Sequence, residues 1–192
     1  MDGTFLYGQT LSTEQDAITP AAGNALNGKV GGFTFYNTTA VALAVGGTSS
    51  VPVLYNPVNS NYNCRIMAVR YGVTAGTWAQ GTVGYGITPN AVLSSLTAGP
   101  AAMPAYVGGV QLACPFLWYT TCTSGAAPTY FRASGINTGG AAAAGPMFNA
   151  TDYINGFVVL APGTAFYPAV SLNAVATTVT VYVDVIATLL GI

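Results

Sequence analysis

The chain has 192 residues and a mass of 19.5 kDa, which indicates one domain, or one domain with an arm. Charged residues make up 5 % of the sequence, against about 25 % in an ordinary globular chain, and histidine is absent. These counts exclude histidine-based catalysis, histidine metal ligation and a basic face for nucleic acid, and 52 % apolar residues exclude a disordered chain.

Residues 1–30 differ from the rest of the chain in composition. They hold three of the five acids and the only lysine, and the Ser-Thr-Glu-Gln sequence at 12–15 has the spacing of a helix-capping box. Pro20 and Gly23 interrupt any longer helix. We therefore predict an extended N-terminal arm with at most a short helix, which is either an untethered end or a tether onto a neighbouring subunit.

Residues 31–192 have the composition of a β-sandwich domain. Val, Thr, Tyr and Phe dominate the periodic segments, and Gly and Pro separate them. The stretches 97–104 and 135–146 are expected to be loops. Long non-hairpin connections favour a jelly-roll-like antiparallel β-sandwich over an up-and-down meander, and the lack of strand–helix alternation argues against an α/β fold. The predicted strands are 33–36, 41–45, 51–54, 64–71, 78–85, 115–121, 129–132, 156–160, 165–172 and 178–189.

The closing segment 178–189 gives the clearest strand signal. Valines at alternate positions from 179 to 185 form one face, and the other face carries Tyr182, Asp184 and Ile186. This second face is mixed rather than strongly polar, which fits contact with another subunit. A carboxylate in mid-strand also predicts an ion pair between Asp184 and one of the arginines at 65, 70 and 132.

No group of residues predicts an active site. A serine or cysteine nucleophile has no histidine to act as its base, and the glycines form no phosphate-binding loop. Asp152 and Asp184 are the only acids of the main domain, and Asp152 follows Asn149-Ala150-Thr151 as a turn or cap residue would. We predict that the chain is not an enzyme and has no catalytic, cofactor-binding or metal site.

The three cysteines have neither the spacing of a disulfide framework nor that of a metal knuckle. If 114–122 is one strand, Cys114, Phe116, Trp118 and Cys122 share a face, and the outer two lie some 26 Å apart, too far to bridge. We expect Cys64, Cys114 and Cys122 to be small buried hydrophobes in a reducing compartment.

The N-terminal sequence Met-Asp-Gly-Thr-Phe-Leu-Tyr has neither the basic segment nor the apolar core of a secretory signal. The chain also lacks a stretch of about 20 uninterrupted apolar residues. We expect neither export nor a membrane partner.

The scarcity of charge leaves two interpretations of the surface. A folded monomer of this mass exposes roughly 8,500 Å², so each of the nine charges serves about 900 Å². Either neutral polar groups wet this surface, as in many extracellular or viral β-proteins, or other subunits cover much of it, where unpaired charges would be costly. The twelve tyrosines favour the second interpretation, because tyrosine is enriched in interface cores.

The end of the chain resembles a known class of proteins. The sequence Gly-Phe-Val-Val-Leu-Ala-Pro-Gly-Thr-Ala-Phe at 156–166, followed by the closing strand at 177–185, is similar to the last strands of the jelly-roll decoration (cement) and accessory capsid proteins of tailed bacteriophages. Other viral jelly rolls share this pattern. The resemblance implies a non-enzymatic virion structural protein, made in the host cytoplasm, that sits on the outer capsid surface as a homotrimer and clamps neighbouring major-capsid subunits.

On this basis we predict two contact regions. The trimer interface is expected to use Tyr182 and Ile186 on the outer face of the closing strand, and the arm, with Phe5, Leu6 and Tyr7, is expected to contact the shell. Neither nucleic acid nor a cofactor is expected as a partner.

Two other functions stay open at this stage, and a secreted enzyme comes third, because the chain lacks a signal and catalytic bases. A tail or fibre module would bind a glycan or receptor, with Trp78 or Trp118 in an exposed site. The coat protein of a small virus would share the fold, but such shells usually package nucleic acid with a basic arm, and this arm is acidic.

Overall fold

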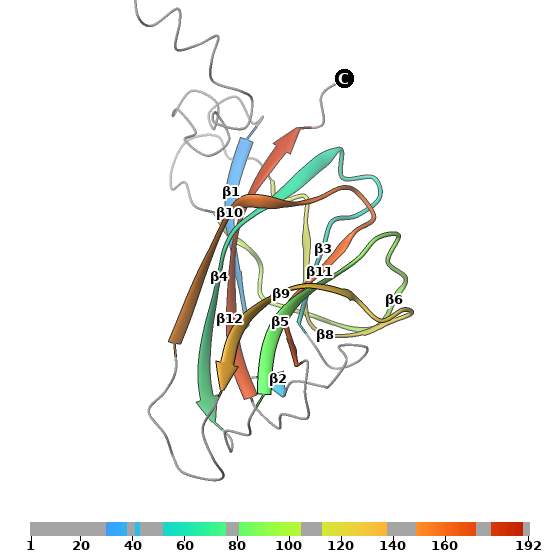
Figure 1. The fold of residues 1–192 in the computed structure, drawn as a ribbon. Helices are drawn as coiled ribbons and strands as arrows, with labels where there is room; N and C mark the ends of the chain where they lie inside the picture. Colours follow the sequence, from blue (N-terminus) through green and yellow to red (C-terminus); the bar gives the residue numbers. More distant parts are fainter. Residues whose placement is uncertain are drawn as a thin grey trace, which may run out of the picture.

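The computed structural model describes residues 30–37, 41–42, 52–75, 81–104, 113–137, 149–171 and 178–189. These residues form two antiparallel sheets that pack face to face as a β-sandwich (Figure 1). The all-β prediction is confirmed. Residues 1–29 of the predicted arm lie outside the described residues, and Val30 begins the first strand. The loop predicted over 135–146 is wrong at 135–137, which continue a strand, and its remainder lies outside the described residues.

The strands are numbered in chain order. Their bounds are β1 Val30–Tyr36, β2 Val41–Ala42, β3 Val53–Tyr55, β4 Tyr62–Ala75, β5 Gly81–Thr88, β6 Leu93–Ala98, β7 Met103–Pro104, β8 Leu117–Ser124, β9 Thr129–Asn137, β10 Asn149–Leu160, β11 Ala165–Ser171 and β12 Thr178–Leu189.

The strand order is that of a jelly roll. The first sheet runs β10-β4-β12-β1-β7, with β2 beside β12, and the second runs β6-β8-β3-β11-β5-β9. From β9 onward each successive strand crosses to the other sheet, and the same alternation links β3, β4 and β5. The four-stranded units β10-β4-β12-β1 and β3-β11-β5-β9 therefore have the jelly-roll arrangement, and β8 and β6 extend the second sheet beyond β3.

The predicted strands agree with the observed ones most closely at the end of the chain, where 178–189 coincides with β12. Two short strands, β6 and β7, were missed, because part of this region was expected to be a loop over 97–104. Nearly all of β6 is exposed, so its sequence has no apolar face to give a periodic signal. Its strand conformation comes from pairing with β8.

The core lies between the sheets and is rich in aromatic residues. The ring centroids of Tyr85 and Phe166 lie 5.8 Å apart, and those of Phe35 and Trp118 lie 6.0 Å apart. Trp118 also donates from Nε1 to the backbone oxygen of Tyr36 over 2.8 Å, which joins the second sheet to the first. The inward valines of β12, at 181, 183 and 185, belong to this same cluster, as the alternation predicted.

One buried asparagine organises the turns at one end of the sandwich. Asn56 is fully buried, and its Nδ2 donates to the backbone oxygens of Tyr62 and Leu160, each over 2.8 Å. Its backbone also bonds to Thr164 and Gly163 on the β10–β11 turn. Gly163 has a φ of 85°, a conformation that glycine adopts without strain. This end of the sandwich is therefore held by side-chain and backbone bonds together.

Gly99 tests the packing around Trp118. Its N–H donates to the Trp118 backbone oxygen over 2.9 Å, and a Cβ added at 99 would overlap the Trp118 ring. We expect Gly99→Ala to lower the free energy of unfolding by about 2 kcal/mol, because the indole must move out of a packed core. Urea denaturation measures the change. Ala101→Ser, an exposed substitution in the same connection, serves as the control, and an unchanged stability of Gly99→Ala would contradict this account.

Candidate functional site

The outer face of the first sheet carries a cross-strand row of side chains. Tyr36 on β1 lies opposite Tyr182 on β12, which lies opposite Arg70 on β4. The two tyrosine rings are stacked, with centroids 6.0 Å apart and an interplanar angle of 11°. The Arg70 guanidinium lies over the other side of the Tyr182 ring, 5.5 Å from its centroid. Three strands thus place three side chains in contact.

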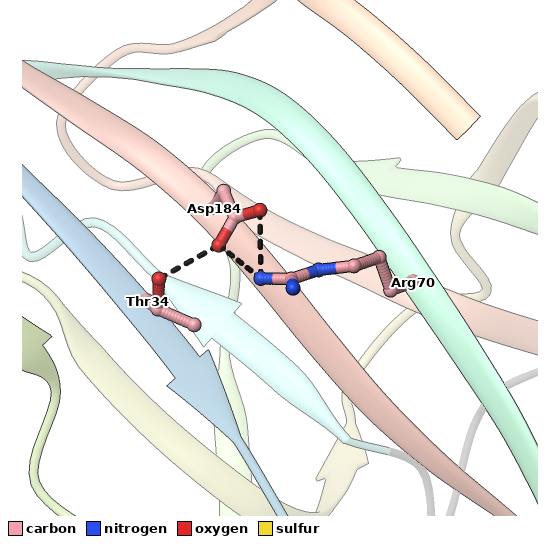
Figure 2. Close-up of polar contacts among 3 residues, drawn as sticks. All are labelled: Thr34, Arg70 and Asp184. Carbon is pink, nitrogen blue, oxygen red and sulfur yellow. Dashed lines mark hydrogen bonds and ion pairs between the residues drawn. The ribbon is translucent and has the colours of Figure 1, made fainter. Parts of the chain in front are cut away.

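An ion pair stands beside this row. Nη2 of Arg70 donates to both carboxylate oxygens of Asp184, over 2.8 and 2.9 Å, and Thr34 Oγ1 donates to Asp184 Oδ1 over 2.7 Å (Figure 2). The sequence predicted a partner for Asp184 among three arginines, and the structure identifies it as Arg70. We call Thr34, Tyr36, Arg70, Tyr182 and Asp184 the outer ladder.

The geometry of the outer ladder restricts what it can bind. Both faces of the Tyr182 ring are covered, by Tyr36 and by Arg70, so the ring cannot stack on a sugar. The side chain is nevertheless 37 % exposed. The charges of Arg70 and Asp184 neutralise each other. The outer ladder thus presents a partly exposed tyrosine beside an ion pair whose charges cancel, and tyrosine is enriched at contacts with other proteins.

Ile186 does not meet the expectation of an accessible interface residue. It lies on the outward face of β12, as the alternation predicted, but only 8 % of it is exposed. Arg65 is its direct neighbour on β4, and the Nε atom of Arg65 is shielded from solvent. A long arginine stem can cover apolar surface on the face that it shares with such a neighbour. Alternation assigns a residue to a face and says nothing of what covers it.

The other predicted contact residues lie beyond the structure. Phe5, Leu6 and Tyr7 are outside the described residues, so their contacts stay a prediction. Sequence reasoning missed Tyr36, and it missed the contact of Arg70 with Tyr182, since only the register between β1, β12 and β4 brings these residues to Tyr182.

The two acids of the main domain do not form a pair. Asp152 was predicted in a turn or cap, which is wrong, because it lies within β10 opposite Val69 of β4. The Tyr85 hydroxyl, from the second sheet, donates to Asp152 over 3.2 Å. Asp152 therefore faces the interior side of the first sheet and Asp184 the exterior side. The placement of these two carboxylates offers no geometry for paired acid–base chemistry.

The cysteines are free thiols in apolar surroundings, and Cys64 and Cys122 are buried. Burial raises the pKa of the Cys114 and Cys122 thiols to about 11, and burial together with the neighbouring Cys114 thiol raises the pKa of Cys64. Thiols in this state are protonated at neutral pH and poor nucleophiles. Among the described residues no group of three or more potential ligands is placed to hold a metal ion.

The prediction that Cys122 shares a face with Trp118 is wrong. Trp118 packs between the sheets, whereas Cys122 belongs to a second cluster with Val53, Ala165 and Tyr167. The register between β8 and β6 shifts after Tyr119, and this irregularity reverses the side to which the following residues point.

The structure also bears on two features that relate to glycans. Trp118 is 5 % exposed, so it does not offer a glycan-binding platform, and Trp78 lies outside the described residues. Asn37 begins an Asn-Thr-Thr acceptor sequence, but it is 2 % exposed and its Oδ1 accepts a hydrogen bond from the Val181 N–H. A buried amide with this role is unavailable for glycosylation.

In the described part of the chain, no helix has the length and apolar character needed to span a membrane. Comparison with protein-family models, with curated proteins and with solved structures gives no match to this chain.

The thiol pKa values predict a pH dependence of stability. The folded values of Cys114 and Cys122 are raised from 9.0 to about 11, so the unfolded state loses these protons first as the pH rises. Their contribution to stability is fully present below about pH 9 and is lost between about pH 9 and pH 11. Urea midpoints across this range should fall more steeply for the wild type than for the Cys114→Ala/Cys122→Ala variant, which retains the tyrosine titrations. Parallel curves would refute the assignment.

Proposed function

We propose that this chain is a non-enzymatic virion structural protein that self-associates, as a homotrimer, and decorates the outer surface of a phage capsid, where it stabilises contacts between major-capsid subunits. The observation that carries the proposal is the outer ladder, in which a partly exposed tyrosine lies beside an ion pair whose charges cancel on the outer face of the first sheet. The jelly-roll order of the strands is consistent with the resemblance from which this function was inferred.

The chemistry of the surface supports assembly rather than catalysis. The chain carries nine charged side chains in 192 residues and a net charge of −1, so copies repel one another weakly. Interfaces bury about 800 Å² per partner, and tyrosine supplies apolar area together with a hydroxyl at the rim. A protein that binds only the assembled shell stabilises it by mass action, and repetition over the particle multiplies a modest interface.

The self-association can be tested at Tyr182. We expect Tyr182→Asp to raise the dissociation constant of the oligomer by about 30-fold or more, because a carboxylate would be desolvated beside Asp184. Ile186 is left intact, since a charge at this buried position would threaten the fold itself. Sedimentation velocity reports the mass, and circular dichroism confirms that the variant is folded.

Tyr130→Asp is the matched control for this test. The exposed fraction of Tyr130, 39 %, is similar to the 37 % of Tyr182, but Tyr130 lies on β9 of the second sheet. The Tyr130→Asp substitution should leave the oligomer intact. A monomeric wild type, or an equal loss in both variants, would contradict an interface on the outer ladder.

Particle binding tests the decoration role directly. Purified protein mixed with phage heads that lack it should co-sediment with the heads and raise their melting temperature, as preferential binding to the assembled state requires. Tyr130→Asp should behave as the wild type does. A folded oligomer that does not sediment with heads would refute the decoration role and leave a receptor-binding tail module as the alternative.

A further inference from the structure

Three apolar side chains project from β10, the edge strand of the first sheet. Phe157 is 89 % exposed, Tyr153 69 % and Val159 42 %. They point outward at alternate positions, whereas Ile154, Val158 and Leu160 pack inward on the core. We call Tyr153, Phe157 and Val159 the side patch. A cluster of large apolar groups this exposed indicates a surface that something covers.

A specific backbone feature projects the most exposed member. Residues 154–157 lie opposite the single residue Met67 of β4, and within this bulge Asn155 and Gly156 have φ values of 54° and 77°. A left-handed asparagine is uncommon, and an Asn-Gly pair adopts this geometry with least strain. The bulge ends at Phe157, after which 158–160 pair regularly with β4.

β10 also has an open backbone edge. Among the described strands only β4 pairs with it, so its other side presents the N–H and C=O groups of an edge strand. The end of β10 therefore combines a regular free edge over 158–160 with two outward apolar residues, Phe157 at the end of the bulge and Val159. This is the pattern to which an extended peptide adds as a further strand.

We propose that residues 4–7 of the same chain lie along this edge as a parallel strand, with Phe5 beside Phe157 and Tyr7 beside Val159. The proposal concerns the free protein and does not depend on the decoration role.

The sequence of the segment matches the edge. Phe5 and Tyr7 are two residues apart, as are Phe157 and Val159, so one register pairs both sets on the same face. Residues 3–13 carry no charge, and neither do residues 153–160, so the pairing of the two segments buries no charged side chain. Gly8 follows the segment directly and allows the chain to turn away from the sheet.

Residues 8–29, which connect the proposed strand to β1, are long enough to reach from the edge of β10 to the start of β1. The register places Val30 opposite Thr188, Thr188 opposite Asn63, and the adjoining Cys64 opposite Leu160. The start of β1 and the end of β10 therefore lie at the same end of the sheet, three strand spacings or about 14 Å apart. Residues 8–29 extend to about 75 Å at most, and a segment parallel to β10 finishes at this same end.

These distances favour the same chain over a neighbouring copy. The added strand lies one spacing beyond β10, about 19 Å from β1, and a flexible linker of this length, with a root-mean-square span of roughly 26 Å, reaches that far without being stretched. Its effective concentration at the edge is then in the millimolar range, above the concentration of other copies in dilute solution.

Disulfide trapping tests the contact. The Phe5→Cys/Phe157→Cys variant, in the full chain and in dilute solution, should form an intrachain disulfide on mild oxidation, because paired residues on adjacent strands lie within reach of one. Peptide mapping of the monomer band identifies the bond. The native thiols compete poorly, since burial raises the pKa of Cys64 and Cys122.

The control pair is Phe5→Cys/Val92→Cys. Val92 is 72 % exposed and precedes β6 at the second sheet, so it is as accessible but lies away from the side patch. We expect about tenfold less intrachain disulfide from the control. Equal yields from the two pairs, or an interchain disulfide in the Phe157 variant, would overturn the proposal, the second result by assigning the segment to a neighbouring copy.

Limited proteolysis gives a second readout without engineered thiols. Phe157→Ser should increase chymotrypsin cleavage after Phe5, Leu6 or Tyr7 by about tenfold, because the segment loses its covering contact. Val92→Ser should leave the rate unchanged. A rate unaffected by Phe157→Ser would overturn the proposal, whatever the outcome of particle binding.

Discussion

The pairing of β12 with both of its neighbours is the constraint on which the described structure depends. β4 pairs with β12 from Thr178 to Leu189, and β1 pairs with it from Tyr36 to Val30. Because side chains alternate, one register places the valines in the core and Tyr182 and Asp184 outside. A slip of one residue would bury Asp184 and expose Val183, so the hydrophobic core and the outer ladder are set together.

The outer ladder contributes less to stability than to the character of the surface. The side chains of Arg70 and Asp184 are 45 % and 30 % exposed, and ion pairs in such settings contribute about 0–1 kcal/mol. Stability comes instead from the core between the sheets, with its aromatic residues and the Trp118 link to Tyr36. The ion pair cancels two charges in the middle of a sheet face, and the loss of either partner would leave a net charge there.

The sequence predicts the class of fold because its strongest signals are local. Period-two alternation marks β12, and the Pro-Gly turn separates β10 from β11, so β11, β12 and the last part of β10 were correctly placed, whereas residues 149–155 of β10 were not predicted as strand. The exposure of a side chain and its contacts are set by the register between strands that are distant in sequence. For this reason the burial of Ile186 and the contact of Arg70 with Tyr182 were not predicted. Asp152 was misplaced for a related reason: β10 begins at Asn149, and tertiary pairing with β4 overrides the turn tendency of Asn149-Ala150-Thr151.

Two surfaces of different construction share the first sheet, and their positions determine whether both can be used at once. The outer ladder spans β1, β12 and β4, whereas the side patch belongs to β10 and its free edge. A strand added beside β10 extends the sheet sideways and leaves Tyr182 uncovered, so intrachain cover of the edge and self-association through the ladder do not compete. Covering the edge also removes the free backbone groups and the apolar rings that would otherwise favour unspecific strand pairing in a chain with so little charge repulsion. The Asn155-Gly156 bulge fixes Phe157 outward, so the proposed covering segment has one defined place to bind.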